Sequence, residues 1–420
     1  MEILPIQHPL QATVRVPGSK SLTNRALLLS VLANGKTRLT NALFSDDSCY
    51  LAKALQALGF DVRLNESNLE MTVTGLGGII PAQRADLFVG NSGTTARFLT
   101  AFLTLANGEY IIDGEPRMRE RPIGDLVAAL TQLGAELEAT NDCPPVKIIA
   151  SGLPGGKTKI AGDISSQFLS ALLMIAPYAK EPVEIIVSTE LNSKPYVDMT
   201  IAIMQDFGVE IERDDYKGFT IRPTYYLPLT TYQAESDASA ASYFFAAPAI
   251  CGGTVRVENI SRDSKQGDIA FLDILHRMGC GIEEGTRFIE VTGTGQLSGV
   301  DVDMRDIPDT AQSLAAVAPF ASSLTRIRGI ASARLKETDR VHATCTELAR
   351  IGVRVEEHED GMTIYPCEKF LPATIQTYND HRMAMGFSLI GLRVPGITIE
   401  NPSCVSKTFP SYFDVLEMLR

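Results

Sequence analysis

The chain has 420 residues, which at the usual ~100 to 200 residues per domain predicts two or three domains. Its formal charge of −12 argues against general binding to nucleic acid or membrane surfaces, and no apolar run reaches the ~18 residues that a membrane span needs. The seven cysteines are scattered and never in CxxC spacing, which argues against a disulfide framework and a zinc site. We therefore expect a cytoplasmic globular protein that binds no metal.

The first element is predicted in VPGSKSLTNRALLLSVLA, residues 16–33. Ser19 or Ser21 can cap the apolar helix, which places Lys20 and free backbone N–H groups at a helix N-terminus, where the dipole favours anions. Ser21 and Arg25 are four residues apart and share a helix face. The stretch is not a nucleotide P-loop, because GSKS lacks the second glycine at the required offset. A capped helix with a solvated lysine and arginine is the alternative interpretation.

Two more polar helix starts follow along the chain. In VGNSGTTARFLTAFL, Gly90 and Gly93 flank Asn91 and allow a ligand to approach the backbone closely. In GDISSQFLSALLMIA, Ser165 and Ser166 precede an apolar helix. Each stretch alone is also typical of an ordinary capped turn. Three polar helix starts in succession, however, indicate helix dipoles that converge on one anionic ligand.

Cations are concentrated in three other stretches. Arg121 ends a run of arginines in DGEPRMRERPIG, and such a run is usually a solvated loop. The sequence RLKETDRVHATCTEL predicts Lys336 and Arg340 at the start of a helix, and YNDHRMAM predicts His381 and Arg382 at the start of another. Exposed i,i+4 ion pairs are the alternative for both stretches.

Carboxylates accompany these cations. Glu337 lies between Lys336 and Arg340, and VDMRDIPDTAQSL adds Asp306 and Asp309. Capping the helix that follows is the alternative role for one of these two aspartates. A carboxylate set among cations is a candidate for proton transfer beside a bound anion.

One pattern recurs along the chain, in which an amphipathic helix ends at a glycine and a short strand follows. The glycines lie 71 to 75 residues apart and are Gly59, Gly134, Gly208, Gly279 and Gly352. Glycine readily takes the left-handed conformation that ends a helix. With a last helix in residues 412–419, the pattern predicts six similar units, grouped as two lobes of three. The segment Arg222–Asp237, rich in Pro, Tyr and Thr, is the predicted crossing between lobes.

The motifs together point to a known family. PGSKSLTNR, GNSGTTAR, EPRMRERPIG, GDISSQFLSALL, DIPDTAQ, RLKETDR, YNDHRMAM and KTFPSYF occur in the order found in enolpyruvyl transferases. The chain resembles, along its whole length, the branch of this family that uses phosphoenolpyruvate and shikimate 3-phosphate. The resemblance implies an α/β fold of two lobes, each with three βαβαββ units in an inside-out α/β barrel, with helix N-termini facing the interlobe cleft. It also implies a discontinuous lobe, residues 1–18 and 235–420, and a second lobe, residues 19–234.

The resemblance further implies which residues bind each substrate. Those implied for shikimate 3-phosphate are Lys20, Ser21, Arg25, Ser165, Ser166, Gln167, Ser193, Tyr196, Asp309, Ser332 and Lys336. Those implied for phosphoenolpyruvate are Lys20, Asn91, Gly93, Thr94, Arg121, Gln167, Arg340, Arg382 and Lys407. At Ser332 well-known relatives have an asparagine that contacts the shikimate ring, so this contact is expected to be lost or bridged by water.

The implied reaction transfers the enolpyruvyl group to the 5-hydroxyl of shikimate 3-phosphate and releases phosphate. The implied catalytic residues are Lys20, Asp309, Lys336, Glu337 and His381. Glu337 would move the proton at C3, while either Lys336 or Asp309 would be the base near the attacking hydroxyl. No cofactor is expected, because phosphoenolpyruvate already carries an activated enol. We also expect a monomer whose phosphoenolpyruvate site accepts the inhibitor glyphosate.

Two other functions fit the sequence less well. The sister enzyme that uses a UDP-amino sugar usually carries a catalytic cysteine, or in some members an aspartate, on the loop before the arginine-rich ERP segment, and this chain has no cysteine from residue 52 through 142. A non-catalytic repeat scaffold that binds polyanions would not need Glu337 among cations, nor would it favour a net acidic chain.

Overall fold

The computed structural model describes residues 1–420, and the chain divides into two compact units. The discontinuous unit consists of Met1–Pro17 and Glu235–Arg420, and the continuous unit consists of Gly18–Ala234. Each unit has a hydrophobic core of its own. None of the helices has both the length and the apolar character that crossing a membrane requires.

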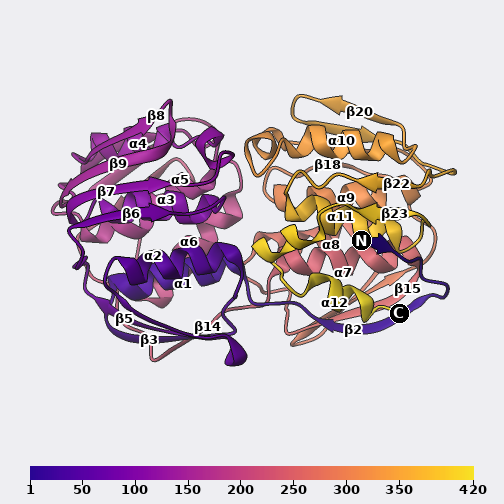
Figure 1. Ribbon diagram of the computed structural model, residues 1–420, viewed down its shortest axis with the longest axis horizontal. Helices are drawn as coiled ribbons and strands as arrows, with labels where there is room; N and C mark the ends of the chain where they lie inside the picture. Colours follow the sequence, from indigo (N-terminus) through magenta and orange to yellow (C-terminus); the bar gives the residue numbers. More distant parts are fainter. The chain divides into compact units, whose positions relative to one another are not determined.

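The continuous unit is coloured from indigo to pink in Figure 1. Its helices are α1 (Lys20–Leu32), α2 (Asp46–Ala57), α3 (Gly93–Leu103), α4 (Gly124–Gln132), α5 (Ser166–Ile175) and α6 (Lys194–Asp206). Its strands are β3 (Asn34–Thr40), β4 (Asp61–Asn65), β5 (Glu70–Leu76), β6 (Arg84–Phe88), β7 (Asn107–Asp113), β8 (Glu136–Thr140), β9 (Cys143–Ser151), β10 (Gly156–Ile160), β11 (Val183–Val187), β12 (Glu212–Asp214), β13 (Gly218–Ile221) and β14 (Thr231–Gln233).

The discontinuous unit holds both chain termini (Figure 1). Its helices are α7 (Ala238–Cys251), α8 (Phe271–Met278), α9 (Ala311–Val317), α10 (Arg340–Arg350), α11 (His381–Gly391) and α12 (Tyr412–Glu417). Its strands are β1 (Glu2–Ile3), β2 (Leu10–Arg15), β15 (Gly253–Glu258), β16 (Gly281–Glu284), β17 (Phe288–Gly293), β18 (Asp301–Asp303), β19 (Thr325–Arg328), β20 (Val355–His358), β21 (Gly361–Ile364), β22 (Ala373–Ile375) and β23 (Ile397–Ile399).

The strands form six small sheets, three in each unit, which confirms the predicted α/β class. The unit β6–α3–β7–α4–β8–β9 is typical: β6 pairs parallel with β7, while β9 pairs antiparallel with both β7 and β8. A parallel pair needs a crossover connection, which α3 provides, whereas β8 and β9 are joined by a hairpin. The βαβαββ order therefore follows from two strands that are each followed by a helix and a hairpin that ends the unit.

The chain passes between the two units twice, and each time it does so between a strand and the helix that follows that strand. Strand β2 pairs parallel with β15 of the discontinuous unit, and the chain then enters the continuous unit at α1. Strand β14 pairs parallel with β3 of the continuous unit, and the chain then returns at α7. The sheets are consequently not built from six consecutive segments of about equal length. One sheet of the discontinuous unit also differs from the other five, since it has three strands, in the order β1-β23-β22, and each of the others has four.

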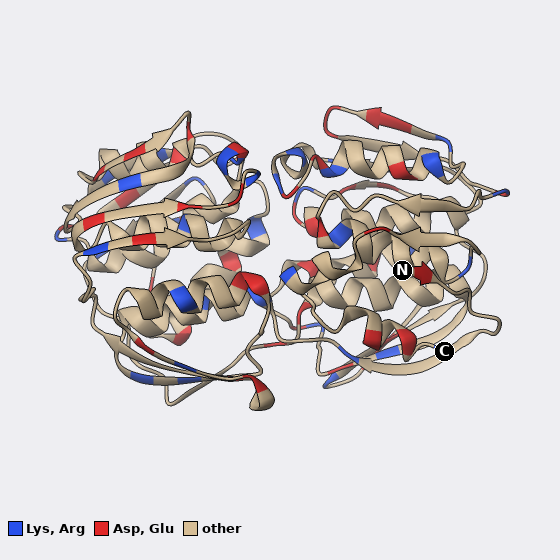
Figure 2. Cartoon of the chain, in the orientation of Figure 1, with Lys and Arg blue, Asp and Glu red and all other residues tan.

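Helices lie inside each unit and sheets form its outer faces (Figure 1). Helices α5, α7 and α9 contain no charged residue and are buried almost throughout, whereas strands such as β9 and β11 alternate between buried and exposed positions (Figure 2). A helix that is apolar all round must be surrounded by protein, while an alternating strand buries one face only. This composition accounts for the layering.

The glycines predicted to end helices do so. All five have φ between +83° and +112°, which a residue with a Cβ rarely adopts. All seven cysteines are free, and no group of three or more His, Cys, Asp or Glu side chains is arranged to hold a metal ion.

The segment Arg222–Asp237 contains the boundary between the two units, which falls after Ala234. Tyr226 is buried and its hydroxyl donates to the carbonyl of Met174 at 2.9 Å, and residues 231–233 form β14. Most of this segment therefore packs on the continuous unit, because Tyr226 and Tyr232 bury apolar surface there. The crossing between the units therefore lies inside the predicted segment, near its C-terminal end.

Candidate functional site

In the continuous unit, Arg25 is a buried cation held by neutral groups. It projects from α1, is 2% exposed and donates to the hydroxyls of Thr200 at 2.7 Å and Ser170 at 3.2 Å. Its guanidinium carbon lies 5.3 Å from the centroid of the Phe98 ring. Burial lowers the pKa of Arg25 to about 10, because no carboxylate is close enough to stabilise the charge. The guanidinium is thus fixed in orientation and suited to an anionic ligand.

The predicted polar helix starts are caps. The hydroxyl of Ser19 accepts from the amide of Leu22, that of Ser92 accepts from Thr95, and that of Ser165 accepts from Gln167. These bonds satisfy one amide in each first turn and leave others available at the dipole's positive end.

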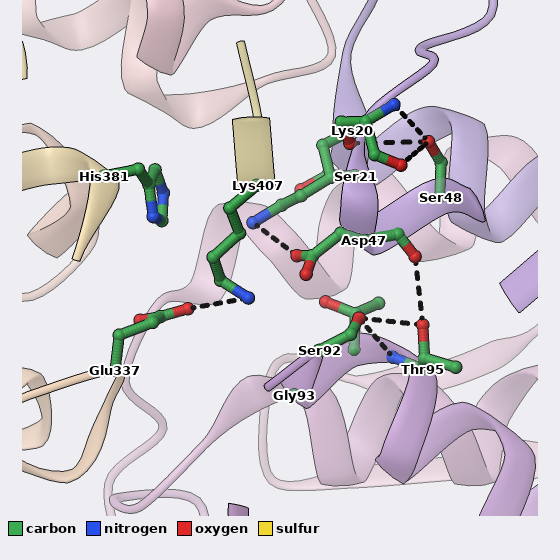
Figure 3. Close-up of polar contacts among 12 residues, drawn as sticks. Lys20, Ser21, Asp47, Ser48, Ser92, Gly93, Thr95, Glu337, His381 and Lys407 are labelled. Atoms are coloured by element: carbon green, nitrogen blue, oxygen red, sulfur yellow. Dashed lines mark hydrogen bonds and ion pairs between the residues drawn. The ribbon is translucent and has the colours of Figure 1, made fainter. Parts of the chain in front are cut away.

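Lys20 and Arg121 provide two further cations beside these helix starts. The Nζ of Lys20 lies 3.5 Å from the Asp47 carboxylate at the start of α2 (Figure 3). Arg121 is 5% exposed and donates to the carbonyl of Asn91 at 2.9 Å and to its side-chain oxygen at 3.1 Å. A Cβ on Gly93 would lie 2.5 Å from Nη2 of Arg121, so the absence of a side chain here permits the arginine's position.

The remaining predicted residues of this unit lie near α5 and α6. The side-chain amide of Gln167 donates to the hydroxyl of Thr94 at 3.3 Å, and this bond joins the starts of α5 and α3. Ser193 is the residue before α6 and has a φ of +57°, and the carbonyl of Tyr196 accepts from Arg25 at 3.3 Å. We call Lys20, Ser21, Arg25, Asn91, Gly93, Thr94, Arg121, Ser165, Ser166, Gln167, Ser193 and Tyr196 the Arg25 group.

In the discontinuous unit, Asp309 forms ion pairs with three cations. Lys336 Nζ and Arg340 Nη1 approach the same carboxylate oxygen, the latter at 3.2 Å, and Arg382 Nη2 approaches the other oxygen at 2.7 Å. The three cations come from different elements: Lys336 follows a 3-10 helix (Ala331–Leu335), Arg340 begins α10 and Arg382 lies in the first turn of α11. The fold therefore gathers positive charge around one carboxylate.

Glu337 is the second carboxylate of this cluster. It is 8% exposed, and its oxygens lie 2.7 Å from Arg340 Nη2 and 3.6 Å from Lys407 Nζ (Figure 3). His381 is fully buried at the start of α11, with its Nδ1 3.4 Å from Asp380. We call Asp309, Lys336, Glu337, Arg340, Asp380, His381, Arg382 and Lys407 the Asp309 cluster.

Two sequence expectations for this cluster need correction. Lys336 precedes α10 instead of lying on it, because Asp339 caps that helix by accepting from the amide of His342 at 2.9 Å. Neither Asp306 nor Asp309 caps α9, which has no side-chain cap; Asp309 is drawn instead to the neighbouring cations. Burial lowers the pKa of Lys336, while the adjacent Asp309 opposes this shift.

Both groups combine buried arginines, lysines and helix N-termini, which are the structures that proteins use to bind phosphate and carboxylate. A family model described as EPSP synthase (3-phosphoshikimate 1-carboxyvinyltransferase) matches residues 4–416. The chain belongs to the EPSP synthase family. It is therefore a transferase, and the family resemblance seen in the sequence motifs is confirmed.

Named relatives support the assignment over the full length. The chain is 50% identical to 3-phosphoshikimate 1-carboxyvinyltransferase of Nostoc punctiforme over 415 residues, covering 98% of this chain and 97% of that one. It is 52% identical to the same enzyme of Shewanella denitrificans over 408 residues, covering 96% and 95%. Among solved structures, EPSP synthase of Acinetobacter baumannii matches with a TM-score of 0.83 at 26% identity, covering 100% of this chain and 97% of that one.

Within this member of the EPSP synthase family, Ser332 lies half-buried in the 3-10 helix that precedes Lys336. Several residues that hold the site in place were not among those predicted. Thr200 and Ser170 bind Arg25, and Tyr243 accepts a hydrogen bond from Arg382 at 3.3 Å. For Ser170 and Tyr243 the available signal was a polar side chain in an otherwise apolar helix, since such a group needs a buried partner.

Proposed function

We propose that this chain transfers the enolpyruvyl group of phosphoenolpyruvate to the 5-hydroxyl of shikimate 3-phosphate and releases phosphate. The reaction belongs to the shikimate pathway, which leads to chorismate and the aromatic amino acids. The observation that carries the proposal is Glu337, a buried carboxylate held by Arg340 and Lys407 in a cluster rich in cations. A site that only bound polyanions would be weakened by such a carboxylate, whereas a carboxylate can transfer a proton to and from a bound substrate.

Part of the Arg25 group is proposed to bind shikimate 3-phosphate. Arg25 and Ser21 would bind its phosphate, because Arg25 is a preoriented buried cation with no carboxylate partner. Ser165, Ser166 and Gln167 would add donors at the start of α5. The other implied shikimate contacts are Ser193, Tyr196, Asp309, Ser332 and Lys336.

Phosphoenolpyruvate carries a phosphate and a carboxylate and therefore needs several cations. Lys20 and Arg121 are proposed to bind it, together with Asn91, Gly93, Thr94 and Gln167. Arg340, Arg382 and Lys407 are the other residues implied for it. The cations of the Asp309 cluster are at present compensated by carboxylates of the chain, so a bound anion would compete with Asp309 for them.

The chemistry is an addition followed by an elimination. The 5-hydroxyl oxygen bonds to C2 of phosphoenolpyruvate, its proton passes to a base, and C3 accepts a proton. The tetrahedral intermediate then loses a proton from C3 and phosphate from C2. Glu337 would move the proton at C3 in both directions. Lys336 is the better base for the hydroxyl, since burial lowers its pKa, and Asp309 would position it.

The proposal includes three finer statements. The protein acts as a monomer in the cytoplasm. It needs no cofactor, because the enol of phosphoenolpyruvate is already activated. Glyphosate, an anion slightly longer than phosphoenolpyruvate, inhibits it by occupying the phosphoenolpyruvate region beside shikimate 3-phosphate.

The test is to measure phosphate release with both substrates, with UDP-N-acetylglucosamine as the control acceptor. Two matched variants sharpen it: Arg25→Ala should raise the KM for shikimate 3-phosphate more than that for phosphoenolpyruvate, and Arg121→Ala should do the reverse. If phosphate is released with UDP-N-acetylglucosamine as the acceptor but not with shikimate 3-phosphate, the assignment of the acceptor is wrong. Equal effects of each variant on both KM values would overturn the division of the site.

A further inference from the structure

Thr95 connects two helix starts in the continuous unit (Figure 3). It lies in the first turn of α3 and is fully buried. Its hydroxyl accepts from the hydroxyl of Ser92, the cap of α3, at 2.8 Å, and donates to the backbone carbonyl of Asp47 in the first turn of α2 at 3.2 Å. The bond to Asp47 spans 48 residues of sequence, so it is tertiary and not part of a local turn.

The two residues bonded to Thr95, Asp47 and Ser92, lie next to residues that are proposed to bind phosphoenolpyruvate. The carboxylate of Asp47 lies 3.5 Å from Lys20 Nζ. Ser92 lies between Asn91, which accepts from Arg121, and Gly93, whose missing side chain makes room for Arg121. A change in the spacing of α2 and α3 would therefore move Lys20 relative to Arg121.

We propose that Thr95 is a positioning residue for phosphoenolpyruvate, which fixes the spacing of Lys20 and Arg121 through its bonds to Asp47 and Ser92. The inference rests on the proposed placement of phosphoenolpyruvate at these cations. It assigns Thr95 no contact with the substrate. Groups that act on two anionic ends of one ligand must be held to within a fraction of an ångström, which buried hydroxyl bonds between elements can do.

Thr100 is a matched control on the same helix. It is also fully buried, but its hydroxyl donates at 2.8 Å to the carbonyl of Ala96, one turn earlier in α3. Replacement of either threonine by valine preserves volume and removes one hydroxyl. Only Thr95→Val breaks a bond between helices, so the pair separates positioning from general packing.

The experiment measures kcat and both KM values for Thr95→Val, Thr95→Ser, Thr100→Val and the native protein, with urea unfolding as a check on folding. Thr95→Val should raise the KM for phosphoenolpyruvate by ~3- to 10-fold, the size of effect expected when a buried neutral hydroxyl loses its hydrogen bonds. The KM for shikimate 3-phosphate should change less than twofold. Thr95→Ser, which keeps the hydroxyl, should restore most of the affinity, and Thr100→Val should match the native protein.

The inference fails if Thr95→Val and Thr100→Val behave alike, or if Thr95→Val raises both KM values equally. Arg121→Ala, measured in parallel, separates this failure from failure of the proposed function. If Arg121→Ala weakens phosphoenolpyruvate and Thr95→Val does not, only the role of Thr95 is wrong. If Arg121→Ala has no effect on phosphoenolpyruvate, the placement on which the inference rests is itself wrong.

Discussion

Arg340 and Asp380 form a fully buried, two-point ion pair. Nε of Arg340 lies 2.8 Å from Oδ2 of Asp380, and Nη2 lies 3.2 Å from Oδ1. Asp380 also caps α11 by accepting from the amide of Arg382 at 2.9 Å. One carboxylate thus joins the starts of α10 and α11 and orients two of the arginines proposed to bind phosphoenolpyruvate.

Replacement of Asp380 by Asn should destabilise the protein. The amide can still cap α11, but Arg340 loses a buried opposite charge, and such losses cost ~3 to 5 kcal/mol. We expect a loss of stability near the lower end of this range, because Arg340 keeps its ion pairs with Asp309 and Glu337. Urea unfolding measures the change. Glu417→Gln, which breaks an exposed pair with Arg420, is the control and should cost less than ~0.5 kcal/mol. Equal small effects would show that the buried pair contributes little.

Replacement of Glu337 by Gln should slow turnover while leaving substrate binding intact. The amide keeps the shape and an acceptor for Arg340 but cannot move a proton, and loss of such a group typically costs ~10²- to 10⁴-fold in kcat. Calorimetric binding and steady-state rates measure the two effects separately. Glu357→Gln, at an exposed pair with Arg334, should leave kcat unchanged. Near-normal turnover in Glu337→Gln would mean that Glu337 only pairs with cations.

Replacement of Gly93 by Ala should reduce inhibition by glyphosate more than it reduces affinity for phosphoenolpyruvate. From the sequence, a methyl here was expected to project towards the ligand; in the structure it would meet Nη2 of Arg121 at 2.5 Å and Nη1 of Arg97 at 2.9 Å. Arg121 must therefore shift, and the longer inhibitor should lose more, by ~1 to 3 kcal/mol.

The measurements are the inhibition constant of glyphosate and the KM for phosphoenolpyruvate, both at saturating shikimate 3-phosphate. Gly218→Ala is the control, since a Cβ there meets only ordinary contacts at 3.8 Å. Resistance of the native protein, or equal losses for inhibitor and substrate, would contradict the role given to Gly93.

Replacement of Asp268 by Asn should stabilise the protein in a pH-dependent way. Burial, with a contribution from Asp309, raises the pKa of Asp268 from 3.8 to about 6. The folded state therefore binds this proton more tightly than the unfolded state. The resulting stabilisation is fully present below pH ~3.8 and is lost as the pH rises through ~6.

Asparagine does not titrate and can still accept the hydrogen bond from Ser239. Relative to the native protein, the variant should thus gain up to ~3 kcal/mol between pH 4 and pH 8, by the usual conversion of ~1.4 kcal/mol per pKa unit. Urea unfolding at both pH values measures this difference. A constant offset between the two proteins would show that Asp268 does not titrate in this range.

Local chemistry explains what could be predicted from the sequence. The caps at Ser19, Ser92 and Ser165 and the glycines that end helices depend on residues within one turn, so the pattern of neighbours is sufficient to predict them. The same holds for the cation-rich helix starts at Arg340 and Arg382. Long motifs in a fixed order then identified the family, and with it the candidate substrates.

Only the tertiary structure decided which of these residues are buried and what each contacts. Arg25 meets Thr200 and Ser170, which are 175 and 145 residues away, and strand β2 pairs with β15 across most of the chain. Asp309 could have been an ordinary helix cap, but packing brings three cations to it from separate elements. Sequence patterns report the conformations that neighbouring residues favour, whereas charge compensation and burial depend on which distant segments the folded core brings together.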